Sequence, residues 1–248
     1  MLKRFFVIAA ASVITAGTAL SAVAPDAIAF MSQVRRPTGQ QSYAKMDGVV
    51  RHLRKGADTI EYPLYFGIML TEKRRLSQII VNNAEGYNIG QSYSSGNEGT
   101  TVTPMRDGGY QQSILGNFGI RPEDLSMSFL YWNVFAEEPK SSFRTVDCRV
   151  FLLKNPQSAE MARAYISEDS LFPVKVEFFP NDKTDIDPER TMEVEKFKKT
   201  DNDFWVPTQL KLYGPGWRTQ VVFENVTAEN LDPKNPPTDV LNRKIINE

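Results

Sequence analysis

The sequence is poor in the residues that most often carry catalytic chemistry. Its 248 residues include a single cysteine, Cys148, and a single histidine, His52. One cysteine excludes an intramolecular disulfide. Zinc sites usually use several His or Cys ligands, and a catalytic histidine needs a carboxylate and a nucleophile beside it, so neither arrangement is indicated. We interpret His52 as a strand residue and Cys148 as a small buried apolar residue.

The sequence also lacks a strong charge of either sign. It has 29 basic and 30 acidic residues, a formal net charge of −1. Such a balance argues against nucleic acid or an anionic membrane surface as a partner.

No motif for a phosphate or a metal ion is present. The Ser- and Gly-rich stretch between Tyr93 and Gly109 lacks the strand, helix and Lys-Ser/Thr of a phosphate-binding loop, so we expect a surface loop. The carboxylates between Asp182 and Glu189 lack the central glycine of a calcium loop and suit a solvated hairpin tip. We therefore predict no cofactor, no metal and no enzymatic activity.

The N-terminus carries the clearest signal that is present. Lys3 and Arg4 precede the uncharged stretch Phe5–Val23, which is the pattern of a secretory signal peptide. The alternative is a membrane anchor, but the stretch is diluted by Ser, Thr and Gly and is borderline in length for a span, which takes about 20 strongly apolar residues. We predict a signal peptide over residues 1–24, with cleavage between residues 21 and 29, and a single periplasmic domain over 25–248.

A short helical stripe follows directly. Ala27, Phe30, Met31 and Val34 are spaced at i, i+3, i+4 and i+7, which predicts an amphipathic helix with Asp26 as its N-cap.

From Ser42 onward the apolar residues recur with a period of two. Strict alternation predicts antiparallel strands with one dry and one wet face. The clearest dry-face sets are Phe172, Val174, Val176 and Phe178; Phe204, Val206, Leu210 and Leu212; Trp217, Thr219, Val221 and Phe223; and Val146, Cys148, Val150 and Leu152. Further strands are expected over Tyr43–Arg54, Thr59–Thr71, Arg74–Asn82 and Gly86–Ser92. Because Tyr62–Leu70 is apolar on both faces, its outer side should be covered.

The predicted fold is mainly β, a strongly curved antiparallel half-barrel of about 9–11 strands roofed by short helices, since a long meander curls as it twists. One helix interrupts the strands. It begins at Pro122 and is apolar around most of its circumference through Trp132, so it either fills the core or forms a lid over an apolar cavity.

Five segments together resemble the outer-membrane lipoprotein-sorting superfamily, the periplasmic lipoprotein carriers and their relatives. They are Arg121–Trp132, Asp147–Leu153, Phe172–Phe179, Trp205–Leu212 and Gly216–Phe223. The resemblance implies a half-barrel whose concave apolar face shields acyl chains. Carriers of this type hold the lid with a strand arginine, and the sequence does not single out one among Arg51, Arg54, Arg74 and Arg75.

These observations predict a non-catalytic periplasmic carrier of lipoprotein or lipid acyl chains, with inner- and outer-membrane transport proteins as further partners. The alternatives are an envelope interaction or sensor protein with a filled barrel and, less favoured, an envelope hydrolase. The residues expected to line the apolar cavity are Phe66, Leu125, Phe129, Trp132, Val174, Val176, Phe178, Leu210, Trp217 and Phe223.

Overall fold

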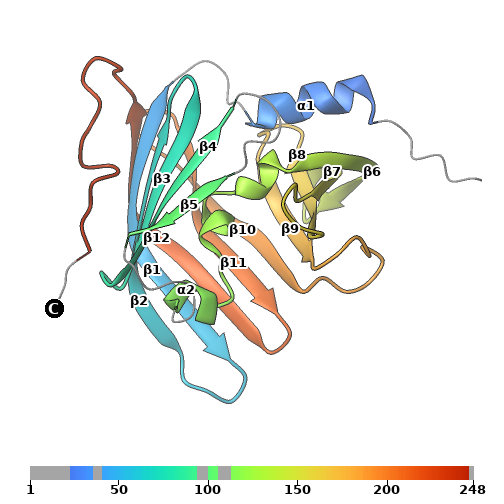
Figure 1. Ribbon diagram of the computed structural model, residues 1–248, viewed down its shortest axis with the longest axis horizontal. Helices are drawn as coiled ribbons and strands as arrows, with labels where there is room; N and C mark the ends of the chain where they lie inside the picture. The colour runs from blue at the N-terminus through green and yellow to red at the C-terminus, as the bar shows by residue number, and fades with distance from the viewer. Residues whose placement is uncertain (1–22, 36–40, 94–99, 106–112, 246–248) are drawn as a thin grey trace, which may run out of the picture.

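A computed structural model describes residues 23–35, 41–93, 100–105 and 113–245. One twelve-stranded antiparallel sheet dominates it and stays open, with the strand order β5-β4-β3-β2-β1-β12-β11-β10-β9-β8-β7-β6 (Figure 1). The strands are β1 (Ser42–Arg54), β2 (Ile60–Leu70), β3 (Arg74–Val81), β4 (Glu85–Ser92), β5 (Thr101–Pro104), β6 (Asn133–Phe143), β7 (Val146–Lys154), β8 (Met161–Ser167), β9 (Pro173–Phe179), β10 (Arg190–Lys199), β11 (Trp205–Gly214) and β12 (Trp217–Asn230). The curved antiparallel sheet predicted from the sequence is confirmed.

The sheet consists of two meanders rather than one. Strands β1–β5 and β6–β12 each run as a series of neighbouring strands, and β1 pairs with β12 from Ser42↔Asn230 to Arg54↔Trp217.

The described sheet has twelve strands, whereas the sequence predicted about 9–11. Register shifts interrupt β6 and β10, which hides their alternation in the sequence. The expected loop after Tyr93 contains β5, which pairs with β4, while residues 94–99 and 106–112 lie outside the described part.

Helix α1 (Pro25–Arg35) lies over one end of the sheet (Figure 1). It buries Ala27, Met31 and Val34, so the predicted stripe is confirmed. The helix begins at Pro25, earlier than predicted, so Asp26 lies in its first turn and not at the N-cap, and its carboxylate there is favoured by the positive end of the helix.

The helix expected from Pro122 to Trp132 is broken in two. The α-helix α3 (Pro122–Leu125) is followed by Met127 in the left-handed conformation (φ 54°) and then by the 3₁₀ helix η2 (Ser128–Tyr131). The Ser126 hydroxyl bonds the Glu123 carbonyl at 3.2 Å and the Ser128 hydroxyl at 2.6 Å. Such side-chain bonds compete with the helical backbone bonds, which explains why the apolar run does not form one continuous helix.

The main hydrophobic core fills the concave side of the sheet. It receives Val176 and Phe178 from β9, Leu210 and Leu212 from β11, and Val221 and Phe223 from β12, so the phase predicted for these strands is confirmed.

Strand β7 corrects the sequence interpretation. Phe151 and Leu153 point into the main core, whereas Leu152 belongs to a second cluster with Met161 and Phe179 on the other face. The face of β7 predicted to be dry is therefore the outer one, and both faces are buried. The predicted wet position Arg149 lies beneath α1, 4.7 Å from the Phe30 ring centroid, so a charged residue occupies the concave side.

The outer face of β2 is covered, as the sequence predicts. The chain after β12 runs along the outer side of β1–β3 (Figure 1). The Tyr65 hydroxyl donates to the Val240 carbonyl at 2.7 Å, and Gln78 Nε2 donates to the Leu241 carbonyl at 3.0 Å. Gly67 permits this approach, because a Cβ there would lie 2.0 Å from the Val240 carbonyl oxygen.

His52 and Cys148 are both buried strand residues. His52 Nδ1 lies 2.7 Å from the Thr219 hydroxyl and the ring stacks on Phe118, which follows helix α2 (Ile114–Asn117). Burial lowers the pKa of His52, with a further contribution from the positive charge of Arg54. Burial raises the pKa of the Cys148 thiol. Both residues therefore serve packing.

Candidate functional site: an apolar pocket beside a polar cleft

Two cavities lie on the concave side, and residues 122–132 line both of them. We call this stretch, which comprises α3, the turn at Met127, η2 and Trp132, the divider. Met127 and Leu130 face one cavity, Ser128 and Trp132 face the other, and Tyr131 contributes to both. The divider therefore presents two different surfaces to two different environments.

The first cavity, the apolar pocket, has a volume of about 430 Å³, within the range of small-ligand sites. It is enclosed by the end of α1, the divider, β1, β2, the β8–β9 turn and the start of β11. Its apolar walls include Val34, Ala44, Met46, Phe66, Ile68, Leu70, Leu125, Met127, Leu130, Leu171, Phe172, Phe204 and Val206. Trp205 also contributes, and its 67% exposure places it at the rim.

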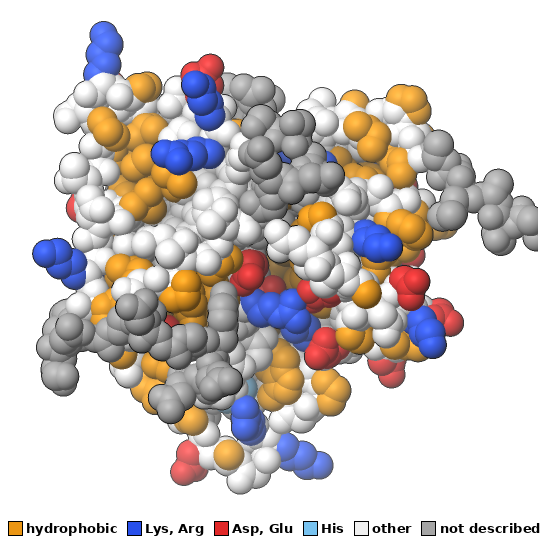
Figure 2. Space-filling model, in the orientation of Figure 1, with side chains coloured by type: hydrophobic (Ala, Val, Ile, Leu, Met, Phe, Trp, Pro, Cys, Tyr) orange, Lys and Arg blue, Asp and Glu red, His pale blue; other side chains and the backbone are white. Residues whose placement is uncertain are grey.

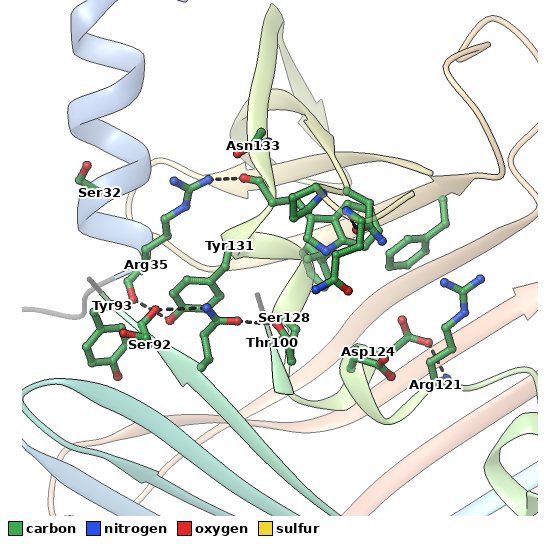
Figure 3. Close-up of a pocket in the computed structure, with 18 of the residues that line it drawn as sticks. Ser32, Arg35, Ser92, Tyr93, Thr100, Arg121, Asp124, Ser128, Tyr131 and Asn133 are labelled. Atoms are coloured by element: carbon green, nitrogen blue, oxygen red, sulfur yellow. Dashed lines mark hydrogen bonds between the residues drawn. The ribbon is translucent and has the colours of Figure 1, made fainter. Parts of the chain in front are cut away.

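The second cavity, the polar cleft, has a volume of about 460 Å³. Hydroxyl, amide and charged side chains dominate its lining, including Gln91 and Gln157. Ser32, Thr100 and Asn133 also line it (Figure 3). Acidic and basic side chains lie next to one another near the middle of the same face of the molecule (Figure 2).

Ion pairs neutralise the charges at the floor of the polar cleft. Arg190 pairs with the buried Asp124, and Arg121 Nη1 lies 2.7 Å from the Glu160 carboxylate. The Arg190 guanidinium also lies 3.9 Å from the centroid of the Phe178 ring. These bonds anchor α3 to β10 and to the β7–β8 turn.

Glu123 is the exception in this cluster. Its Oε2 is buried without a hydrogen-bond partner among the described residues. Burial raises the pKa of Glu123, and the neighbouring Asp124 carboxylate adds to the shift.

Arg35 ties α1 to the far end of the divider. Its guanidinium donates to the carbonyls of Leu130 and Trp132, both at 2.6 Å, and the Tyr131 hydroxyl donates back to the Arg35 carbonyl at 2.8 Å (Figure 3). Burial lowers the pKa of Arg35.

The sequence offered four arginines, Arg51, Arg54, Arg74 and Arg75, as candidates to hold a lid. Of these four, Arg75 lines the apolar pocket. It also lies against the Tyr131 hydroxyl, where its charge offsets part of the burial that raises the tyrosine pKa. Arg74 is exposed, Arg51 pairs with Glu61, and Arg54 donates to His52 and the Asn117 carbonyl.

The predicted cavity residues divide into three groups. Phe66 and Leu125 line the apolar pocket, whereas Phe129, Trp132 and Phe178 line the polar cleft. Val174, Val176, Leu210, Trp217 and Phe223 line neither cavity. Trp217 instead packs against Gly119, where an added Cβ would lie 2.5 Å from the indole.

The sequence interpretation missed Arg35, Tyr131 and Trp205 as site residues and left Arg75 as one of four candidate arginines. Of these, Trp205 offered a signal, because a tryptophan next to a dry-face phenylalanine at a strand start suits a rim position. The others come together only through the fold.

The acidic residues that the sequence offered as metal ligands or as a catalytic pair do not come together in the structure. Within residues 23–35, 41–93, 100–105 and 113–245, no group of three or more His, Cys, Asp or Glu side chains is placed to hold a metal ion. Asp182, Asp185, Asp187 and Glu189 are exposed between β9 and β10. Glu137 accepts from Arg149 under α1 while Glu138 accepts from Arg163 on the opposite face, so these adjacent carboxylates do not act as a pair.

No helix of the described part is long and apolar enough to cross a membrane.

Comparison with known proteins identifies the fold. No family model and no curated protein matches the chain. Among solved structures, a DUF1329 family protein from Desulfovibrio piger is 16% identical with a TM-score of 0.56, covering 81% of this chain and 90% of its own. An outer-membrane lipoprotein-sorting protein domain from Vibrio parahaemolyticus is 14% identical with a TM-score of 0.57, covering 82% and 91%. The chain therefore has the fold of these domains, as its sequence resemblance implies.

Proposed function

We propose that this protein, whose fold is that of the outer-membrane lipoprotein-sorting domains, is a non-catalytic periplasmic carrier of lipid or lipoprotein acyl chains. The observation that supports the proposal is the apolar pocket between the divider and the sheet, with Trp205 at its rim. Apolar walls with few polar groups suit a hydrocarbon ligand.

Binding would depend on removing methylene groups from water. Each buried methylene contributes about 0.8 kcal/mol, so partial burial of an acyl chain gives several kcal/mol. Release then requires a membrane or receptor with a somewhat better site, and transport proteins of the inner and outer membranes are the partners that this role needs.

A fluorescent fatty-acid probe tests the pocket. Wild-type protein should bind the probe saturably, and Ile68→Glu should abolish binding because it places a carboxylate in the apolar wall, opposite Ser77 and not opposite an arginine. Ile60→Glu is the matched control: it makes the same substitution on β2, at a position that is 44% exposed and outside the pocket.

Non-saturable binding by the wild type would contradict the carrier function and favour an envelope interaction protein with a filled barrel. Equal loss of binding in Ile68→Glu and Ile60→Glu would place the probe somewhere other than the apolar pocket. Thermal melting of both variants separates loss of binding from loss of folding.

A further inference from the structure

The apolar pocket contains two arginines and no acidic residue. Arg35 and Arg75 are the charged residues among the described side chains that line it. A charged group at an apolar wall is costly unless a counter-ion accompanies it. Among its described lining residues, the pocket therefore carries positive charge without a neighbouring carboxylate.

Most other arginines of the described chain are paired, and the ones on strands that are not, Arg54, Arg74 and Arg218, are exposed. Arg51, Arg121, Arg144, Arg149, Arg163, Arg190 and Arg243 each form an ion pair with a carboxylate. Neither Arg35 nor Arg75 has a carboxylate partner among the described residues. Arg35 and Arg75 are thus the half-buried arginines of the described chain that lack a carboxylate partner, and both line the apolar pocket.

Arg35 holds the divider through hydrogen bonds to its backbone. Two of its nitrogens hold the carbonyls of Leu130 and Trp132, which fixes the guanidinium against the divider. It contributes positive potential to the pocket while two of its five N–H donors hold the divider.

Arg75 is differently placed. It is half-buried on β3, its Nε is buried without a hydrogen-bond partner, and its polar neighbour at the divider is the Tyr131 hydroxyl. A guanidinium with an unused buried donor can bind a carboxylate or phosphate through charge-assisted hydrogen bonds. Low polarity around it strengthens such bonds.

We propose that the apolar pocket takes an amphiphile with an anionic head group, a carboxylate or a phosphate, which Arg75 binds while the tail extends along the apolar walls. This inference rests on the proposed carrier function and adds the chemical class of the ligand.

The test uses four ligands with the same twelve-carbon tail, each below its micelle concentration: dodecanoate, dodecyl phosphate, dodecyl maltoside and dodecyltrimethylammonium. The protein is labelled with 5-fluorotryptophan and followed by ¹⁹F NMR. Of its three tryptophans, Trp205 reports on the apolar pocket, Trp132 on the polar cleft, and Trp217, which lines neither cavity, is the reference.

The two anionic ligands should shift the Trp205 resonance at the lowest concentrations, and comparing them distinguishes a carboxylate site from a phosphate site. Arg75→Gln should weaken anion binding roughly ten- to a hundredfold, the effect of losing a charged hydrogen bond. It should leave dodecyl maltoside unchanged. Arg75→Lys should restore part of the anion preference, and Arg74→Gln on the same strand is the matched control.

Two results would overturn the inference: equal affinity for all four heads, or an Arg75→Gln effect that is the same for dodecyl maltoside as for dodecanoate. Failure of every ligand to shift Trp205 would instead contradict the carrier function itself. If Arg75→Gln lowers the melting temperature, the wild-type ranking of the four heads and the Arg75→Lys variant still decide the question.

Discussion

The ion pair between Arg190 and Asp124 should make one of the largest single contributions to the stability of the divider. Both side chains are almost completely buried, with relative exposures of 7% and 3%. Arg190→Met would leave the Asp124 carboxylate without its counter-ion, and removing one partner of a buried pair costs about 3–5 kcal/mol. For a chain of this size each kcal/mol corresponds to about 2–4 °C, so the melting temperature should fall by roughly 6–20 °C.

Urea and thermal unfolding, followed by circular dichroism, measure this change. The double variant Asp124→Asn/Arg190→Met should recover at least half of the loss, because it removes the uncompensated charge while the amide oxygen of the introduced asparagine can still accept the Arg121 backbone N–H. Lys140→Met is the control, since it breaks the largely exposed pair with Glu168 and should cost about 0–1 kcal/mol. If Arg190→Met costs no more than the control, or if the double variant is as unstable as the sum of its parts, the pair does not anchor the divider.

Two further predictions follow from burial. Val176→Asp should lower the melting temperature far more than Lys175→Asp, because Val176 is in the main core and Lys175 is on the opposite face; equal shifts would mean that the phase of β9 is wrong. Glu123→Gln should raise stability at pH 7.5, because the raised pKa of Glu123 means that the folded protein favours its protonated form. That gain should disappear as the pH falls below about 4.3, the ordinary glutamate pKa, where the carboxyl is protonated in both states, and a gain that persisted at low pH would assign the effect to something other than charge.

The sequence predicted the fold wherever a strand has one dry face. Alternation located β9, β11 and β12 with the correct phase, since Val176, Leu210 and Val221 all face the main core. It failed for β7, because Arg149 occupies the concave side beneath α1 and reverses the apparent polarity. The helix prediction failed at Met127. There the hydrogen bonds of the Ser126 hydroxyl to the Glu123 carbonyl and to the Ser128 hydroxyl accompany the break in the helix that the apolar run predicts.

The candidate site was harder to predict, for a physical reason. Phe66 and Leu125 were identifiable because large apolar residues on dry faces are cavity candidates wherever they occur. Arg75 and Tyr131 carry no such local signal. Their importance comes from the divider folding back against β3, which is a tertiary contact that spacing along the chain does not encode.

The pairing of β1 with β12 has a consequence for the time at which the protein can fold. His52 and Thr219, which bond across this pair, are separated by 167 residues. At about 5–20 residues per second, a ribosome needs roughly 8–33 s to make the intervening chain. The centre of the sheet cannot join until nearly the last strand has been synthesised, and such non-local pairing is slow even then. The two meanders therefore remain unjoined throughout synthesis, so the core that they share closes only after the whole sheet-forming chain has been made.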